Sequence, residues 1–286
     1  MSAALLEDAL VTGAAQGSAP RRRRGGARRL LGLLVPALLL GAWYVVSSQE
    51  IVSTRLIPAP GTVTNALVAF FTGDRTDTLA GVVPFTGAGV EHLTASLARC
   101  GISWLLAVAV GVTVGLALGL SRVVRELLEP LLNALRAVPL FAWLPLALVW
   151  FGLGEGAARA IIFVGALWPV LVAVADASAR VPRGHVETAR MLGTPRRWLW
   201  RRVYLPAALP EVVTGLRLSL TLAWTCVIVG ELSGTDRGVG AMMSAARETG
   251  RTEQVVVGIV VFAVVGLLAD TLLRRSTARW VRWARA

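Results

Sequence analysis

The chain alternates long apolar runs with short polar segments. Six runs are long enough to cross a bilayer, because a helix needs about 20 apolar residues to span the hydrocarbon layer. They cover residues 30–49, 100–121, 131–152, 159–175, 212–231 and 254–273. The pattern therefore predicts an all-α membrane protein with six transmembrane helices.

The segments around these runs indicate how the chain is organised. Residues 1–29 are small, polar and irregular in pattern, which predicts a disordered cytoplasmic tail. The run at 30–49 is too long for the apolar region of a signal peptide and lacks a small-x-small cleavage site, so it is interpreted as an uncleaved first transmembrane helix. Residues 50–92 are predicted to form an external segment, in which residues 62–71 form an amphipathic helix at the membrane interface. Residues 93–286 are predicted to form the transmembrane core.

Three glycines in the second apolar run recur at every fourth position, at Gly111, Gly115 and Gly119. Residues four apart lie on the same face of a helix, so this helix would have one smooth side. Small residues in that arrangement let two membrane helices approach closely. The spacing predicts helix packing and not a chemical site.

Two prolines interrupt the third apolar run, which follows a polar connector predicted at 121–130. Pro139 and Pro145 lie inside the run. Each proline lacks an N–H group and frees a carbonyl in the preceding turn, and lipid cannot satisfy that carbonyl. The run is therefore predicted to be a helix buried in protein, with the prolines marking where it can break.

A polar island from Val186 to Pro210 separates the fourth and fifth runs, within the segment 179–211. Residues 184–192 are predicted to form a short helix with Glu187 in its first turn, where a carboxylate suits the positive end of the helix dipole. Gly193 is expected to end this helix, because glycine adopts the left-handed conformation at little cost.

A second helix is predicted directly after this stop. Thr194 has the side chain of an N-cap and Pro195 suits the first helical position, whereas Leu205 and Pro206 are expected to end the helix. Arginine occupies positions 196, 197, 201 and 202. The two helices would form an elbow that is too polar to cross a membrane and too regularly punctuated for an irregular loop.

Composition supports membrane insertion and excludes several chemistries. The chain has 286 residues, of which 55% are hydrophobic, and a mean hydropathy of +0.66. All 29 basic residues are arginine, a bias that we attribute to genomic base composition. Without lysine there can be no P-loop lysine, Schiff-base lysine or Ser-Lys dyad. A nucleotide site of the P-loop type is therefore excluded.

The distribution of arginine predicts the topology. With the N-terminus inside, twenty arginines fall in cytoplasmic segments and five in external loops. This asymmetry follows the positive-inside rule for six spans with cytoplasmic N- and C-termini. The net charge of +12 is thereby explained without nucleic acid, because the arginines interrupt apolar spans and do not line a basic domain face.

No catalytic or metal-binding grouping is evident in the sequence. Cys100 and Cys226 both lie within apolar runs, so neither a disulfide framework nor a metal site is indicated. His92 and His185 are far apart and lack companions at ligand spacing, and we interpret them as interfacial polar residues. The chain is therefore expected not to be an enzyme.

Charged residues inside apolar runs are costly and are candidates for function. Asp176 and Asp270 lie at predicted cytoplasmic ends, where either snorkelling or pairing with a nearby arginine explains them. Arg136 and Arg217 are placed on the inner side, either as helix-end anchors or as contacts for an anion. Glu231, near the outer end of the fifth run, suits a gate or a structural role. The candidate path or gate residues are Arg136, Pro139, Pro145, Arg217 and Glu231.

The spacing within the elbow resembles a known signature, E-A-A, three residues, G, nine residues, I-x-L-P, found in the cytoplasmic loop of ABC-importer permeases. Thr188 and Val203 are the two departures, at the second position and at the isoleucine. The segments SLAR, SRVVRELLEPLLNALRAVPLFAWLPLALVWFGLGE and TGLRLSLTLAWTCVIVGEL extend the resemblance from about His92 to the C-terminus. They are similar to the sulfonate/nitrate/taurine branch of that family.

The resemblance implies a type I ABC importer permease fold in the bacterial cytoplasmic (inner) membrane. Two such subunits, here expected to be identical, would form the path for a sulfonate, taurine, nitrate or related small anion delivered by an external binding protein. Separate ATPase subunits would hold ATP and Mg²⁺, so no cofactor is expected on this chain. The ATPase-coupling residues carried over from the signature are Glu187, Thr188, Ala189, Gly193, Val203, Leu205 and Pro206.

Two other classes remain open from the sequence. A secondary transporter or channel working alone would show paired half-repeats and a self-contained charged site at the membrane midplane, and neither is visible in the sequence. A membrane scaffold would dock a partner without ligand-stimulated ATP hydrolysis. Co-purification of an ATPase discriminates the importer from the first class.

Overall fold

The structure is a computed structural model that describes residues 25–49, 53, 56–73, 78–79, 83–180 and 183–278. It divides into two units, Met1–Ile51 and Val52–Ala286. In the first unit, helix α2 covers Gly25–Ser48. Its start corrects the predicted boundary, because residues 25–29 are helical and not part of a tail. Residues 1–24 of the predicted tail, and the arginines after Ala278, lie outside the described residues.

Four helices of the second unit are long and apolar enough to cross a membrane. They are α4 (Gly89–Leu120), α7 (Glu155–Ala179), α10 (Leu205–Glu231) and α12 (Thr252–Ala278). A bent helix pair described below gives a fifth candidate span. The prediction of an apolar, all-helical membrane architecture is confirmed in these elements, whereas the count of six spans and the sides of the termini stay predictions.

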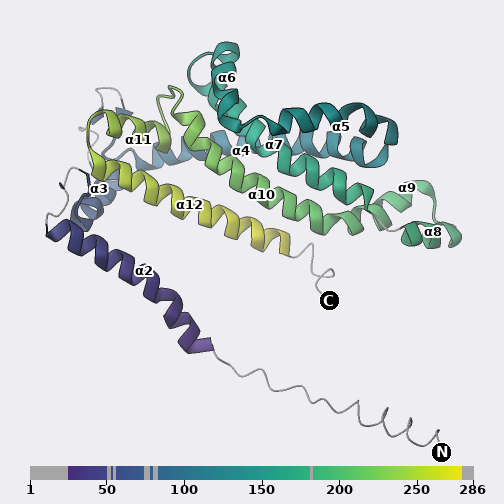
Figure 1. Cartoon of the computed structure of the whole chain (residues 1–286), viewed down its shortest axis with the longest axis horizontal. Helices are drawn as coiled ribbons and strands as arrows, with labels where there is room; N and C mark the ends of the chain where they lie inside the picture. The colour runs from purple at the N-terminus through teal and green to yellow at the C-terminus, as the bar shows by residue number, and fades with distance from the viewer. Residues whose placement is uncertain are drawn as a thin grey trace, which may run out of the picture. The chain divides into compact units, whose positions relative to one another are not determined.

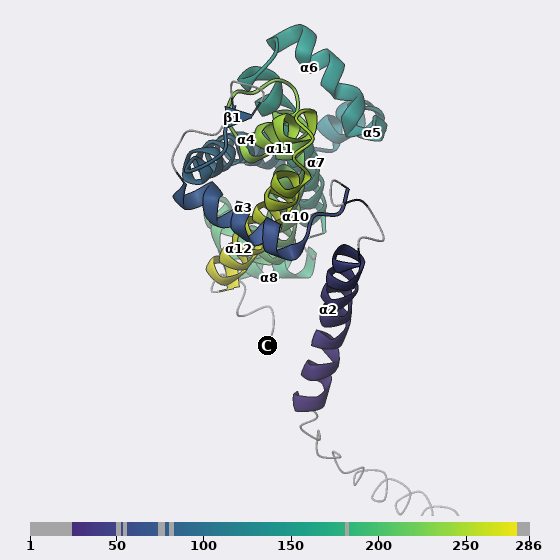
Figure 2. The ribbon, with the colours of Figure 1, turned by 90° about the vertical axis from the view of Figure 1, so that its left-hand side faces the viewer.

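Helix α7 lies at the centre of the second unit, packed between α4 and α10 (Figures 1 and 2). The predicted smooth face of α4 makes this packing close. A Cβ atom on Gly111 would lie 3.0 Å from Val170, and one on Gly115 would lie 2.8 Å from the carbonyl oxygen of Leu171. Gly119 meets Ser178 in the same way, near the far end of α7. The packing prediction drawn from the four-residue spacing is confirmed.

The third apolar run is divided differently from the prediction. Helix α5 (Arg122–Ala137) is continuous through the predicted connector at 121–130, and it begins where Ser121 Oγ accepts a hydrogen bond from the N–H of Val124 at 3.3 Å. The chain then breaks at Val138 and Pro139, forms the 3₁₀ turn η1 (Leu140–Ala142) and continues as α6 (Trp143–Phe151). The two halves are bent by 90°.

The break occurs at Pro139, as predicted, because a proline disfavours the helical conformation of the residue before it, and Val138 is extended, with φ of −71° and ψ of 123°. Pro145 instead lies in the first turn of α6, where its missing N–H would have had no intrahelical partner. The third apolar run was predicted to be buried in protein, and within a single chain this prediction is wrong. No described residue of α5 is buried, and both prolines are exposed, because no other described element covers this side of the bent pair.

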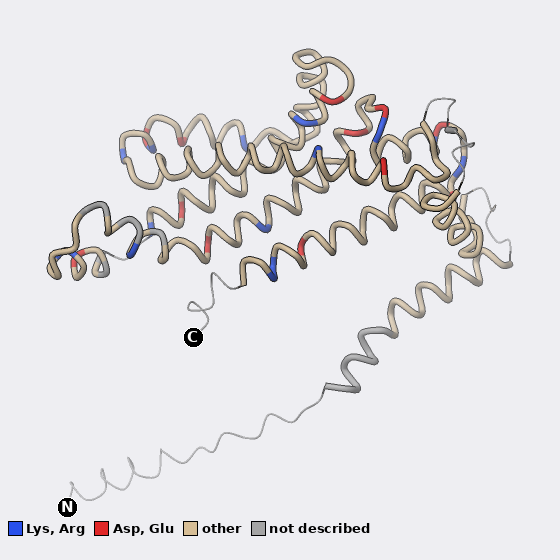
Figure 3. The backbone as a smooth tube through the Cα atoms, turned by 180° about the vertical axis from the view of Figure 1, so that it is seen from behind, with Lys and Arg blue, Asp and Glu red and all other residues tan. Residues whose placement is uncertain are grey.

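The end of the bundle that holds α6 also carries three smaller elements. The predicted amphipathic helix is confirmed as α3 (Pro60–Thr72), but it buries Val63 and Phe70 against protein. A two-stranded antiparallel ribbon pairs β1 (Thr78–Leu79) with β2 (Val83–Pro84). The polar segment after α10 contains a helix that the sequence did not indicate, α11 (Val239–Glu248). Figure 3 shows that charged residues are sparse along the middles of the long helices.

Candidate functional site

The predicted elbow lies beyond the ends of α7 and α10 (Figure 1). Its first helix, α8, covers Arg183–Met191. Gly193 follows with φ of +75°, and its N–H donates to the carbonyl of Arg190 at 2.9 Å, while the N–H of Thr194 donates to the carbonyl of Ala189 at 3.0 Å. This pair of bonds is the Schellman arrangement, which satisfies the last carbonyls of a helix. The predicted stop at Gly193 is confirmed.

The second half of the elbow differs from the prediction in two ways. The first hydrogen bonds of α9 (Arg196–Leu199) are accepted by the carbonyl of Pro195, at 2.8 Å from Trp198 N and 3.2 Å from Leu199 N. Pro195 therefore takes the capping position that was assigned to Thr194. The chain then passes through the π-helix η2 (Trp200–Tyr204) directly into α10.

Leu205 and Pro206 consequently begin α10 and do not end the second helix of the elbow. Pro206 is tolerated because it lies in the first turn, where no N–H is required. The π-helix η2, which has a wider turn, lies directly before α10 and accommodates the missing N–H of Pro206. The elbow is thus joined to the span α10 by continuous helical backbone.

Positions of the signature are mostly exposed on the elbow. Glu187, Thr188 and Gly193 are exposed, and Ala189 is half-buried. Thr188 therefore meets no steric conflict within the described part of the chain. Towards α10, Val203 and Pro206 are half-buried, and the side chain of Leu205 lies outside the described residues.

Two apolar residues at the tip of the elbow were missed by the sequence reasoning. Met191 is 87% exposed and Leu192 is 80% exposed, directly before the Gly193 turn. By contrast, Val186 and Leu199 are buried, so the elbow has an inner face that packs on itself and an outer apolar tip. The signal was available in the sequence, because two apolar side chains stand at the end of an otherwise polar helix.

A cluster of buried polar groups lies at the opposite end of the bundle from the elbow. Arg99 of α4 is 2% exposed and Glu231 of α10 is 1% exposed, and they form an ion pair. Arg99 also pairs with Glu155, the first residue of α7, and donates to the carbonyl of Arg237 at 3.0 Å. One guanidinium group thus connects three long helices and the loop before α11.

The carboxylate of Glu231 has further donors. Ser96 Oγ donates to Oε1 at 2.6 Å, and the N–H of Gly240 donates to Oε2 at 2.7 Å. The N–H of Val239 in turn donates to Ser96 Oγ at 3.0 Å. Glu231 therefore holds the start of α11 against α4 and α10. Its predicted role in a gate stays a prediction.

His92 belongs to the same cluster, which corrects its interpretation as an interfacial residue. Its side chain is fully buried. The N–H of Gly238 donates to Nδ1 at 3.0 Å, so the ring hydrogen is on Nε2, which lies 2.6 Å from the carbonyl oxygen of Pro84. His92 is thus a neutral crosslink between β2 and the loop before α11.

The other candidate charges fall into paired and unpaired groups. Arg217 donates to Asp270 at 3.2 Å, and Arg274 donates to the same carboxylate at 2.9 Å. Asp176 accepts from Arg180 at 3.1 Å. The pairing predicted for Asp176 and Asp270 is therefore confirmed, and Arg217 is a partner of an acidic residue on α12.

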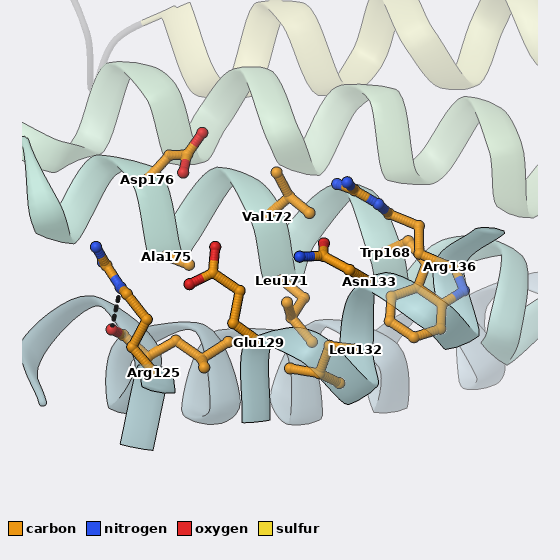
Figure 4. A pocket seen from close by; sticks show the side chains of 11 residues that line it. Arg125, Glu129, Leu132, Asn133, Arg136, Trp168, Leu171, Val172, Ala175 and Asp176 are labelled. Atoms are coloured by element: carbon orange, nitrogen blue, oxygen red, sulfur yellow. Dashed lines mark hydrogen bonds between the residues drawn. The ribbon is translucent and has the colours of Figure 1, made fainter. Parts of the chain in front are cut away.

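Arg136 occupies a different place from the predicted inner end. It lies in the last turn of α5 and shares a cavity of about 330 Å³ with Trp168, which is near the middle of α7. Figure 4 shows Arg136 and Trp168 at one end of this cavity. The prediction placed Arg136 too close to the elbow end because it began the third span at residue 131, whereas α5 begins at Arg122.

No group of three or more His, Cys, Asp or Glu side chains suited to a metal is found among the described residues.

Comparisons with known proteins identify the family of the chain. Residues 107–282 match the family described as binding-protein-dependent transport system inner membrane component. A putative aliphatic sulfonates transport permease protein of Bacillus subtilis (strain 168) is 32% identical over 94% of this chain and 96% of its own length. A taurine transport system permease protein of Escherichia coli (strain K12) is 35% identical over 86% of this chain and 87% of its own.

Among solved structures, a chain of the inward-facing MetNI methionine ABC transporter is similar with a TM-score of 0.52. It is 22% identical, and the match covers 65% of this chain and 94% of that one, which supports the fold alone. The chain belongs to the family of binding-protein-dependent transport system inner membrane components. Within it, the chain is an ABC importer permease of the sulfonate/nitrate/taurine type, a multi-pass protein of the bacterial inner membrane.

Proposed function

We propose that this permease imports a small solute bearing an anionic group, such as a sulfonate, taurine or nitrate, and that a separate ATPase drives it through the elbow at 186–210. The names of the sulfonate and taurine relatives support the solute class. ATP and Mg²⁺ are held by the ATPase subunits, since this chain has no lysine for a P-loop. The chain itself is a transport subunit without a catalytic site.

The exposed tip of the elbow carries this proposal. Met191 and Leu192 present apolar surface beyond the ends of the spans, next to the exposed Glu187 and Thr188. An apolar anchor surrounded by polar groups is the usual composition at the centre of a protein interface. Docking in a groove of the ATPase would bury both side chains, and the polar residues around them would fix the orientation.

The backbone offers a route from the docked tip to the far end of the bundle. The elbow continues through η2 into α10, which packs along α7 and ends at Glu231. Movement of α8 and α9 would therefore displace α10 as a unit. Because Glu231 is bound to Arg99 and to the start of α11, the displacement would reach the opposite mouth of the path.

A second copy of the chain completes the path in this proposal. The side of α5 and α6 that no described element covers contains large apolar side chains, including Leu127, Phe141 and Trp150. A second permease subunit and lipid would cover this surface, and an external binding protein would deliver the solute to the end that holds α6 and α11. The permease dimer would then alternate between openings to the two sides of the membrane.

The test uses two matched substitutions on exposed leucines. Leu192→Glu places a charge in the proposed docking tip, whereas Leu153→Glu places the same charge on a residue that is 79% exposed at the opposite end. The expected result is that Leu192→Glu no longer retains the ATPase during purification in detergent and Leu153→Glu retains it. Equal retention of the ATPase by both variants would contradict the docking site, and solute uptake driven by an ion gradient without any ATPase would contradict the importer.

A further inference from the structure

A cavity of about 480 Å³ is lined by residues of α4, α6 and α7. This volume is within the range of small-molecule sites. Apolar and aromatic side chains form most of the lining. The lining includes Ile102, Leu106 and Trp150, whose side chains are more than half exposed. The cavity, called the α4–α6 cavity below, therefore opens on an apolar surface of the chain.

Two hydrogen-bond donors in this lining have no partner among the described residues. Ser103 is 2% exposed, and both its hydroxyl and the indole N–H of Trp143 are buried and unpaired. Other hydroxyls on α4 donate to the carbonyl one turn earlier, as Thr113 does to Ala109 at 3.0 Å. Because a buried donor without an acceptor is costly, the two donors suit a ligand that places acceptor oxygens among apolar groups.

Arg159 adds a cation to the same lining. Its side chain is 51% exposed and pairs with Glu155 at 3.1 Å. Glu155 is also bound by Arg99, which offsets the repulsion that this carboxylate would exert on a second anion. A guanidinium group has five donors, so the bond to Glu155 leaves others for a phosphate group.

The polar groups of the cavity lie at one depth. Arg159 is four residues after Glu155, the first residue of α7, and Ser103 is four residues after Arg99, which donates to Glu155 at 3.2 Å. Both are therefore one helical turn, about 6 Å, inside this end of the bundle. Helix α7 has 25 residues, or about 37 Å, whereas the hydrocarbon layer is about 30 Å thick. This depth therefore corresponds to the boundary at which lipid phosphates and esters meet the hydrocarbon.

We propose that the α4–α6 cavity binds one glycerophospholipid. Its phosphate binds Arg159, its ester carbonyls accept hydrogen bonds from Ser103 and Trp143, and one acyl chain fills the apolar remainder. An apolar helix, whether from this chain or from a second copy, would leave both donors without an acceptor, because its own carbonyls are bonded within the helix. The charge and donor pattern therefore favour a phospholipid over a protein segment.

The bound lipid would support α6. This helix turns away from the long helices after the 90° bend (Figure 1), and the cavity lies between it and α4. An acyl chain in the cavity would contact α4, α6 and α7 together and so hold α6 in place. The inference goes beyond the proposed function, because it depends neither on the solute nor on the elbow.

A cavity that stays empty makes a different prediction. Ser103→Ala would then remove a buried unpaired group, so it would raise the unfolding temperature and leave lipid binding unchanged. Arg159 would serve only as the partner of Glu155 one turn away, and its replacement would have no effect on lipid binding.

Native mass spectrometry of the full-length permease measures lipid binding directly. The probe is dioleoylphosphatidylglycerol, and the chemical control is dioleoylglycerol, which has the same acyl chains and esters but no phosphate. Arg159→Gln is expected to lower the affinity for phosphatidylglycerol about threefold, as for one half-exposed charge pair, whereas Arg159→Lys retains it. Arg122→Gln is the matched control, because Arg122 is exposed and pairs with Glu126 one turn away.

Two further variants separate the esters and the chain from the phosphate. Ser103→Ala should weaken the binding of both lipids, because both carry ester carbonyls. Ala160→Phe, which places a ring in the cavity, should abolish the binding of both. Unchanged affinity for phosphatidylglycerol in Arg159→Gln, or a more stable Ser103→Ala with unchanged lipid binding, would overturn the proposal.

Photolabelling in nanodiscs locates the acyl chain. A phosphatidylglycerol with a diazirine in one chain should label Ile102 and Leu106, and Ala160→Phe should lose this label while retaining the label on Leu105, which is exposed on α4 but outside the lining. Labelling of Leu105 without Ile102 and Leu106 in the parent would show that protein covers the cavity, which would contradict a lipid site. Neither measurement uses the ATPase or transport, so failure of this site is distinguishable from failure of the proposed function.

Discussion

Arg99 and Glu231 are 132 positions apart in the sequence, yet they form an ion pair in which both side chains are almost fully buried. The pair connects α4 to the end of α10, and Glu155 adds α7 to the same guanidinium group. Such a pair is vulnerable, because removing either partner leaves an uncompensated charge in protein. It fixes the end of α10 that lies farthest from the elbow.

Loss of Glu231 should therefore destabilise the permease. Glu231→Ala is expected to lower the free energy of unfolding by about 3–5 kcal/mol, because Arg99 loses its buried partner. Thermal unfolding in detergent measures the effect, and the apolar pair Arg99→Met with Glu231→Leu should recover part of the lost stability.

Glu231→Ala should also change the coupling of ATP hydrolysis to uptake. Unaltered uptake and unaltered basal ATPase activity in this variant would show that Glu231 is not part of a gate.

The smooth face of α4 gives a second prediction. A side chain at Gly115 would meet the backbone of Leu171 and the side chain of Val174, so Gly115→Val should destabilise the protein by about 1–3 kcal/mol through overpacking. Gly101→Val on the same helix has open space around it and serves as the control. Equal unfolding temperatures for the two variants would contradict the close packing of α4 on α7.

The two interhelical ion pairs should differ in strength. Arg217 and Asp270 have side chains that are about a third exposed, whereas Arg99 and Glu231 are buried. A double-mutant cycle with alanine is expected to give about 1 kcal/mol or less for the first pair and a larger coupling energy for the second. Reversal of the first pair, Arg217→Asp with Asp270→Arg, should retain folding. A larger coupling energy at Arg217 and Asp270 would contradict this order.

Local signals in the sequence predicted the elbow well, because its geometry depends on neighbouring residues. The turn at Gly193 ends α8 through two short-range bonds, because the N–H of Gly193 donates to the carbonyl of Arg190 and the N–H of Thr194 donates to the carbonyl of Ala189. The interpretation failed at Leu205 and Pro206, because a proline that can end one helix suits the first turn of the next equally well. Exposure of the tip at Leu192 depends on tertiary structure, so only the apolar character of that position was visible.

Non-local features could not be predicted in the same way. The bonds of Glu231 to Arg99 and Ser96 join residues more than 130 positions apart, and no periodic pattern in the sequence predicts such bonds. Helix α5 was divided at Pro130 because its charged residues interrupt the apolar run, although they are compatible with an amphipathic helix. That error moved Arg136 away from its mid-depth position and concealed its proximity to Trp168.

Coupling through the elbow is the central claim, and Gly193 tests it most directly. Proline cannot adopt the φ of +75° found there, so Gly193→Pro should deform the elbow without touching the spans. Gly184→Ala, in α8 with open space around it, is the matched control.

The deciding measurement is ATP hydrolysis stimulated by loaded binding protein in the reconstituted complex. We expect Gly193→Pro to insert normally and lose stimulated hydrolysis and uptake, while Gly184→Ala behaves as the parent. Hydrolysis and uptake at the parent's rates in Gly193→Pro would contradict the account.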